Sequence, residues 1–206
     1  MRGKPLLITT LCLTLSLCCL AAVSQADPGH KGKKSQSTLK ASLTPCCEDP
    51  VLEPEAEGRA KRTTQFKKGN VQKDTFTAEV TVPVPSTGLG IADQAAAEAA
   101  DIRLVLSRGG TDYAECLLEI DQGENDEDEG ESEATYQVDV QLQVKKSGPV
   151  LKEEQGTCDV DLGTDGVQPG VPDVQAGDVA TAVVVVDPTD RTKDLPFVDG
   201  TFAQKK

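Results

Sequence analysis

A strict alternation of apolar and polar residues between positions 102 and 144 constrains the fold of this chain more than any other feature. The clearest run covers residues 136–144, where Tyr, Val, Val, Leu and Val are separated by Gln, Asp, Gln and Gln. A period of two places one set of side chains on a core face and the other in water. The same pattern on both sides of Gly109-Gly110 predicts a hairpin, since glycine permits the positive φ of a tight turn. These segments therefore predict a half-solvated antiparallel sheet.

The first 26 residues have the three parts of a secretory signal peptide. Arg2 and Lys4 supply positive charge, residues 6–23 are mostly apolar, and small residues precede a cleavage site after Ala26. A membrane anchor is the alternative, but the apolar run contains Ser and Thr and is short of the ~20 residues that a spanning helix needs. We therefore expect a signal peptide at 1–26, a secreted or periplasmic location, and no membrane insertion after cleavage.

The remainder of the chain divides into a leader and one domain. Residues 27–37 are mainly Gly, Lys, Ser and Gln, a composition that predicts a disordered leader. Residues 38–206 contain several further strand-like runs and are long enough for a single domain with a core. An Ala-rich segment at 92–100 predicts one short helix. We therefore predict an all-β fold, an antiparallel β-sandwich with one short helix and a long acidic loop.

The charge of the chain is strongly negative but unevenly placed. After cleavage it holds 19 Lys and Arg against 34 Asp and Glu, a net charge of −15. This balance argues against binding to nucleic acid or to an anionic membrane surface. Basic residues nevertheless gather in one segment: Arg59, Lys61, Arg62, Lys67 and Lys68. That cluster could bind an anionic partner, or it could form a solvated edge strand on which lysine discourages further pairing.

Four cysteines remain after cleavage, and an even number in an exported chain predicts two disulfides among Cys46, Cys47, Cys116 and Cys158. If the strands of Cys116 and Cys158 flanked the strand at 136–144, they would lie ~9.6 Å apart. A disulfide needs Cα atoms within ~7 Å, so a simple meander favours pairing each with one of the other two cysteines. Placement on opposite sheets would allow Cys116–Cys158 again. A zinc site is the competing interpretation, but histidine and CxxC spacing are lacking.

Two acidic stretches are candidates for weak calcium binding, and their possible ligands are Asp126, Asp128, Asp159, Asp161 and Asp165. The first stretch, residues 123–133, carries seven acidic residues and predicts a long solvated loop. Neither stretch is an EF-hand. With Gly130 or Gly166 at the sixth position, the twelfth is Tyr136 or Pro172 instead of the required Glu.

Three short segments resemble the chordin-type (CHRD) domain over residues 39–121. They are Leu39-Lys-Ala-Ser-Leu43, Glu55-Ala-Glu-Gly58-Arg-Ala60, and Ala99-Ala100-Asp101-Ile102. The resemblance implies an extracellular Ig-like β-sandwich without defined catalytic chemistry. Asp101 and Arg103 stand where the family has histidines, so no role of those histidines carries over.

The residues that would support catalysis are scarce. The one histidine, His30, lies in the leader, so a Ser-His-Asp or Cys-His site has no base within the domain. No Gly-rich phosphate loop follows a strand, and the absence of Trp disfavours a sugar-cleaving carboxylate pair, the lesser alternative. We therefore expect no enzyme and no cofactor, but an exported module that binds a protein partner or has a structural role. The partner would meet the loop at 44–57 or the basic cluster, and a calcium-responsive domain is the main alternative.

Overall fold

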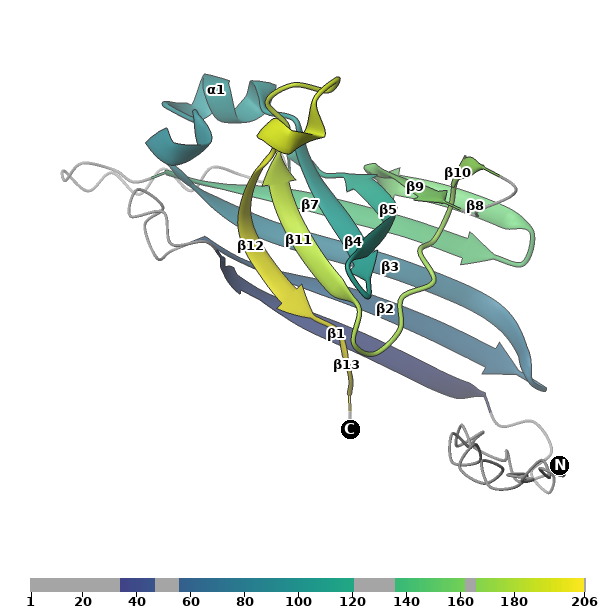
Figure 1. The fold of residues 1–206 in the computed structure, drawn as a ribbon. Helices are drawn as coiled ribbons and strands as arrows, with labels where there is room; N and C mark the ends of the chain where they lie inside the picture. Colours follow the sequence, from purple (N-terminus) through teal and green to yellow (C-terminus); the bar gives the residue numbers. More distant parts are fainter. Residues whose placement is uncertain (1–33, 47–55, 121–135, 162–165, 206) are drawn as a thin grey trace, which may run out of the picture. The chain divides into compact units, whose positions relative to one another are not determined.

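The computed structural model of the chain describes residues 34–46, 56–120, 136–161 and 166–205 (Figure 1). The predicted signal peptide, most of the leader and the acidic loop lie outside these residues, as do Cys47, Asp126, Asp128 and Asp165. Within the described ranges, no helix is long and apolar enough to cross a membrane.

The described residues form thirteen strands and three helical segments. The first strands are β1 (Ser35–Pro45), β2 (Glu57–Lys67), β3 (Asn70–Val84), β4 (Ile102–Arg108), β5 (Thr111–Leu117), β6 (Glu119–Ile120) and β7 (Tyr136–Ser147). The later strands are β8 (Val150–Gln155), β9 (Thr157–Asp161), β10 (Val167–Pro169), β11 (Val179–Val184), β12 (Leu195–Thr201) and β13 (Ala203–Gln204). The helical segments are η1 (Thr87–Leu89), α1 (Gln94–Ala99) and η3 (Arg191–Lys193).

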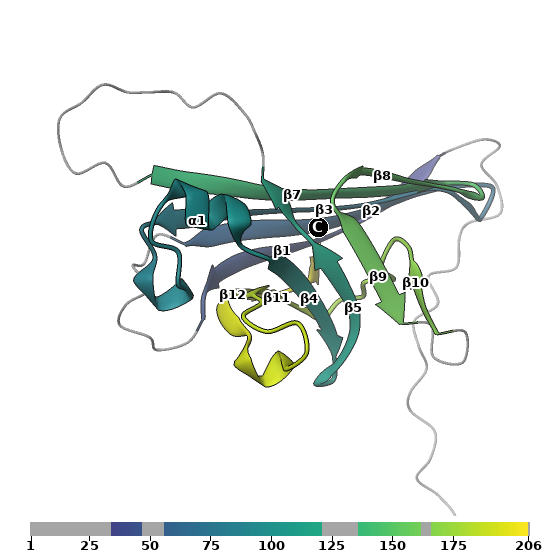
Figure 2. The same ribbon diagram turned by 90° about the horizontal axis from the view of Figure 1, so that it is seen from above.

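All the pairings between strands are antiparallel, and they join the strands in the order β10-β9-β5-β4-β11-β12-β1-β2-β3-β7-β6. Strand β8 pairs with β7, and β13 pairs with β1. We call β1, β2, β3 and β7, with β6 and β8 at their edge, the long half. We call β12, β11, β4, β5, β9 and β10 the short half. The halves form two layers in Figure 2 and are continuous through β1, which pairs with β2 and, at Thr44 and Pro45, with β12.

The core lies between the inner faces of the two halves. In β4 the buried Ile102, Leu104 and Leu106 alternate with half-buried neighbours, as the sequence predicts. The phenyl rings of Phe76, from β3, and Phe202, which follows β12, meet in this core with centroids 6.3 Å apart, and both side chains are buried. Full burial of one such side chain contributes ~1.5–3 kcal/mol, so two facing apolar layers supply the main stabilisation.

The predicted helix is confirmed, with narrower bounds. Helix α1 begins after Asp93, whose carboxylate accepts a hydrogen bond of 2.8 Å from the backbone N–H of Ala96. This is the usual role of Asp at an N-cap, where it satisfies an amide that has no partner within the helix. The helix spans only Gln94–Ala99 and buries Ala97.

The all-β fold class is confirmed, and two finer predictions need correction. The layers are halves of one continuous sheet, because β1 is long enough to pair in both. The predicted leader is too long, because β1 begins at Ser35 and pairs there with Phe66 of β2. A strand that is held by hydrogen bonds to its neighbour's backbone needs few apolar side chains. The composition of residues 35–37 therefore suggested disorder, although these residues form a strand. The Ig-like relation stays a prediction.

The disulfide joins Cys116 of β5 to Cys158 of β9, the pairing that a simple meander disfavoured. The two residues lie directly opposite each other on adjacent strands, with Cα atoms 4.0 Å apart. The assumption of a strand between them is wrong, because β7 belongs to the long half. Cys46 follows β1, and its N–H donates to the carbonyl of Phe197 at 3.1 Å. A second disulfide involving Cys47 stays a prediction.

Candidate binding groove

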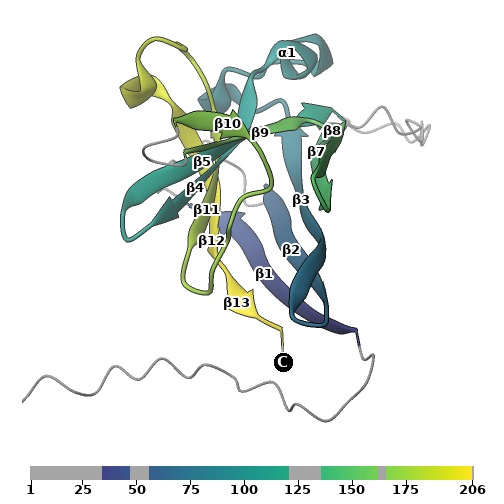
Figure 3. The same cartoon turned by 90° about the vertical axis from the view of Figure 1, so that its right-hand side faces the viewer.

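A hollow with a volume of about 800 Å³ lies on the outer face of the short half. Its lining residues belong to β4, β5, β9, β10, β11 and β12, together with the segment at 191–194. Figures 1 and 3 show where these strands lie in the fold. The alternation of each strand explains this placement, since residues between the buried positions must point outward. We call this hollow the outer groove.

Apolar side chains form part of the groove, although the outer face of a half-solvated sheet is usually polar. Leu117 at the end of β5 is 38% exposed, and Val167 on β10 is 65% exposed. Val105 and Pro196 also line the hollow. Val183 also lines the hollow, and it lies directly after a register shift between Ala182 and Val183 of β11. The groove therefore combines concave shape with exposed apolar surface, the combination typical of binding sites.

A chain of ion pairs crosses one side of the groove. Arg103 donates to Asp101 at 2.5 Å and also to Glu115. Arg191 bonds the other oxygen of Glu115 at 2.5 Å and Asp194 at 2.6 Å. Burial alone would raise the pKa of Glu115, but hydrogen bonds from the two arginines outweigh it and hold that pKa below its ordinary value. Glu115 is therefore an ionised group with a fixed position.

At this end of the groove, one carboxylate oxygen of Asp194 has no hydrogen-bond partner among the described residues. Its Oδ2 accepts from Arg191, whereas Oδ1 is the one buried side-chain polar atom without a hydrogen-bond partner among the described residues. Most buried polar atoms in native proteins have partners, so such an atom marks a place that differs from an ordinary structural ion pair.

Besides Glu115, three carboxylates line the groove on its β5–β9 side: Asp112, Asp159 and Asp161. Two of them are calcium candidates, and they share the exposed face of β9 on either side of buried Val160. Asp159 also lies directly opposite Glu115 of β5. Like charges opposite each other destabilise a sheet, but here the charge of Glu115 is compensated by Arg103 and Arg191. Across the described ranges, no group of three or more His, Cys, Asp or Glu side chains could hold a metal ion.

Tyr113 connects the groove to the buried Asp178. Its hydroxyl donates to Asp178 Oδ2 at 2.9 Å, and the guanidinium of Arg108 lies 4.9 Å from the ring centroid. Arg108 also donates to both oxygens of Asp178, at 2.8 and 2.9 Å. Burial and the hydrogen bond to Asp178 raise the pKa of the Tyr113 hydroxyl. The tyrosine is therefore a neutral, fixed wall of the groove.

The basic cluster does not form the predicted edge. Strand β2 lies between β1 and β3, so it is an interior strand. Arg59 and Lys61 are exposed on its outer face, whereas Arg62 is half-buried among the inward-facing residues. Lys67 and Lys68 lie at the turn into β3. The loop at 44–57, the other predicted contact, lies mostly outside the described residues.

Sequence reasoning missed most of the groove. The hairpin through Gly109-Gly110 brings Arg103 near Glu115, and its register could have suggested that pair. Nothing in the sequence indicates that Arg191 reaches Glu115, since 76 positions separate them. Comparisons with models of known protein families, with curated proteins and with solved structures find no match to this chain.

Proposed function

We propose that this protein is an exported, non-catalytic module that binds a protein partner through the outer groove. The observation that carries the proposal is exposed apolar surface, at Leu117 and Val167, inside a concave face lined by charges. Apolar contact with a polar rim is the usual composition of a protein interface. We retain the Ig-like β-sandwich and the CHRD resemblance as part of this proposal.

The charge of the groove indicates a basic partner segment. Asp112 and Asp159 form no ion pair with any described residue, and the whole chain carries a net charge of −13. A segment with Lys or Arg would be attracted by the field of the protein and would complement these carboxylates. Apolar side chains next to the basic one would contact Leu117 and Val105.

The ionised state of Glu115 supports binding rather than catalysis. A general acid needs a pKa near the working pH, which usually requires burial without a compensating charge. In contrast, the pKa of Glu115 is held below its ordinary value by Arg103 and Arg191. This group therefore suits ion pairing better than proton donation.

Selection of peptides from a random library on the mature protein tests the proposal. Peptides that bind the wild type should bind Leu117→Lys at least ~10-fold more weakly, because the change removes apolar contact and adds repulsion. Val71→Lys is the matched control, since Val71 is an exposed strand valine outside the groove. Peptides that bind both variants equally, or a failure to select any peptide, would contradict the proposal.

A further inference from the structure

The outer face of the long half carries two pairs of lysines that lie directly opposite each other. Lys40 of β1 faces Lys61 of β2, and Lys145 of β7 faces Lys152 of β8. Like charges at opposed positions destabilise a sheet. The charge of Lys145 is compensated by an ion pair with Glu154 at 3.1 Å, whereas the other three lysines form no ion pair with a described residue. The repulsion is therefore only partly compensated within the protein.

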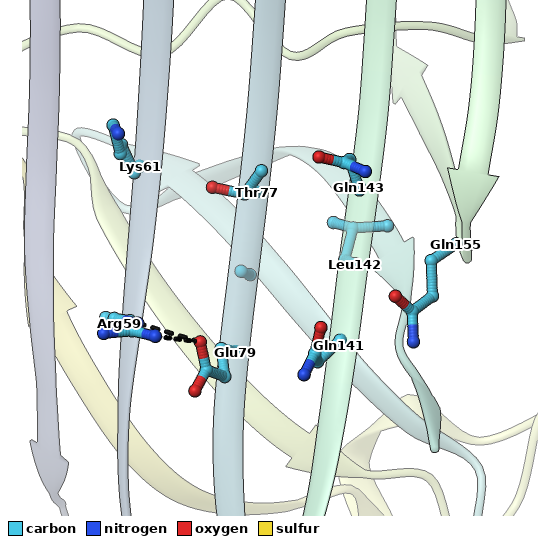
Figure 4. A pocket seen from close by; sticks show the side chains of 9 residues that line it. Arg59, Lys61, Thr77, Glu79, Gln141, Leu142, Gln143 and Gln155 are labelled. Atoms are coloured by element: carbon cyan, nitrogen blue, oxygen red, sulfur yellow. Dashed lines mark hydrogen bonds and ion pairs between the residues drawn. The ribbon is translucent and has the colours of Figure 1, made fainter. Parts of the chain in front are cut away.

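Between these pairs the face is polar and hydrogen-bonding. Thr77 and Gln143 lie side by side on β3 and β7, and Figure 4 shows them next to Lys61 on the same surface. A hollow of about 230 Å³ lies here, and its rim includes Arg59, which is paired with Glu79. Its apolar lining residues are buried members of the inner face. The surface between the pairs therefore offers cations, hydroxyls and amides beside the ion-paired carboxylates of Glu79 and Glu154. Its exposed apolar side chain, Val150, lies at the end of β8 opposite Ser147.

We propose that this outer face of the long half binds a linear sulfated polysaccharide. Protein partners normally supply several clustered aromatic or apolar contacts, whereas Val150 is a single exposed valine at the end of β8. A sulfate ester has three free oxygens, so it can accept hydrogen bonds from two neighbouring ammonium groups and a threonine hydroxyl at once. Because sugars carry many hydroxyls, the amides and hydroxyls between the lysine pairs would suit the remainder of the chain.

The spacing of the two lysine pairs favours a polymer over a single small anion. Adjacent strands lie ~4.8 Å apart, so the centres of the two pairs are separated by about 14 Å across β2, β3 and β7, and Lys145 lies two residues, about 7 Å, further along the strands than the row of Lys61. One sulfate cannot contact both pairs, but successive sulfates on one chain can. Binding at both ends also compensates for the long-range repulsion from a protein with a net charge of −13.

Titration of the mature protein with size-defined heparin fragments at about 150 mM salt tests this inference. We expect Lys40→Ala/Lys61→Ala to weaken binding at least 10-fold and to reduce the dependence of affinity on salt. The matched control is Lys146→Ala, an exposed lysine whose side chain leaves the other face of β7. This control should bind heparin as the wild type does.

Three results would overturn the inference. They are absence of heparin binding by the wild type, equal loss in Lys146→Ala, and equal binding of hyaluronate or polyglutamate, which carry carboxylates but no sulfate. Thermal unfolding of the double variant should show an unchanged or higher Tm, because two uncompensated charges are removed. When the Tm of the double variant is retained, its loss of heparin binding cannot be attributed to unfolding. The groove plays no part in this test, so its outcome is independent of the peptide selection.

Discussion

Arg62 of β2 and Asp74 of β3 form a two-bond ion pair at the margin of an otherwise apolar core. Nε donates to Oδ1 at 3.1 Å and Nη2 to Oδ2 at 2.6 Å, with the side chains only 14% and 11% exposed. Thr64 donates a further bond to Asp74. Arg62 also donates to the carbonyl of Val174 at 2.9 Å. The pair therefore fixes the segment between β10 and β11 to the long half.

Removal of one partner from this pair should be strongly destabilising. Arg62→Met leaves Asp74 buried without its cation, and we expect a loss of about 3 kcal/mol in the free energy of unfolding. Replacement of both residues, as in Arg62→Met/Asp74→Leu, should recover much of the loss because no buried charge remains. Urea denaturation measures both values. An Arg62→Met variant within ~0.5 kcal/mol of the wild type would contradict this interpretation of the pair.

Gly156, between β8 and β9, should tolerate no side chain. Its φ is +66°, and an added Cβ would lie against the carbonyl oxygen of Leu117 and 2.9 Å from Leu142 Cδ1. Gly148 has a φ of +58° with nothing within 4 Å of such a Cβ, so it is the matched control. We expect Gly148→Ala to cost ~1–2 kcal/mol from the backbone alone, and Gly156→Ala to cost clearly more. Equal losses in urea denaturation would argue against this close contact between β9 and its neighbours.

Stability should fall at acidic pH partly through Asp178. Burial alone would raise the pKa of this carboxyl, but hydrogen bonds from Arg108, Gln175 and Tyr113 hold it below the ordinary value. The unfolded chain has a carboxyl pKa of ~3.9. The stabilisation is therefore complete above that pH and is lost as the pH falls through the lower pKa of the folded state.

The Asp178→Asn variant isolates this contribution. It should be less stable than the wild type at pH 6, and the difference should shrink as the pH falls below ~3.9, where the unfolded chain gains a proton that the folded carboxyl resists. Urea midpoints measured at several pH values between 6 and 3 test this expectation. A difference that stays constant over this range would show that Asp178 does not contribute through its charge.

Calcium provides a separate test of the alternative function. A ligand that binds only the folded state must raise Tm, so a calcium-responsive domain predicts a higher Tm in millimolar calcium. We expect no more than a small shift, because the described candidates Asp159 and Asp161 stand on one exposed strand. A large shift that is absent from Asp159→Asn/Asp161→Asn would favour the calcium alternative over our proposal.

The sequence predicted the strands well because their alternation reports directly on burial. The run at 136–144 and the hairpin around Gly109-Gly110 both occur as expected. The order of the strands in the sheet could not be predicted, because an alternation of apolar and polar residues does not show which strands pair with each other. The arrangement of Cys116 and Cys158 was misjudged for this reason. Their strands are adjacent because the chain leaves the short half through β7 and β8 and then returns.

The candidate groove was predictable only in its acidic component. Asp159 and Asp161 could be selected as exposed oxygen ligands from alternation alone. Arg191 could not, because its contact with Glu115 depends on how the loop before β12 folds over the sheet. Arg62 shows the reverse error. Its charge suggested an exposed basic surface, whereas its position in the alternation already placed it with inward-facing Ala60 and Thr64.

Chemical-shift mapping of the ¹⁵N-labelled mature protein with the tightest selected peptide tests the outer groove most directly. We predict that the peptide carries Lys or Arg and that the largest amide shifts fall on β4, β5 and β9, around Leu117 and Asp159. Largest shifts on the long half, or a selected peptide that is acidic, would contradict the account.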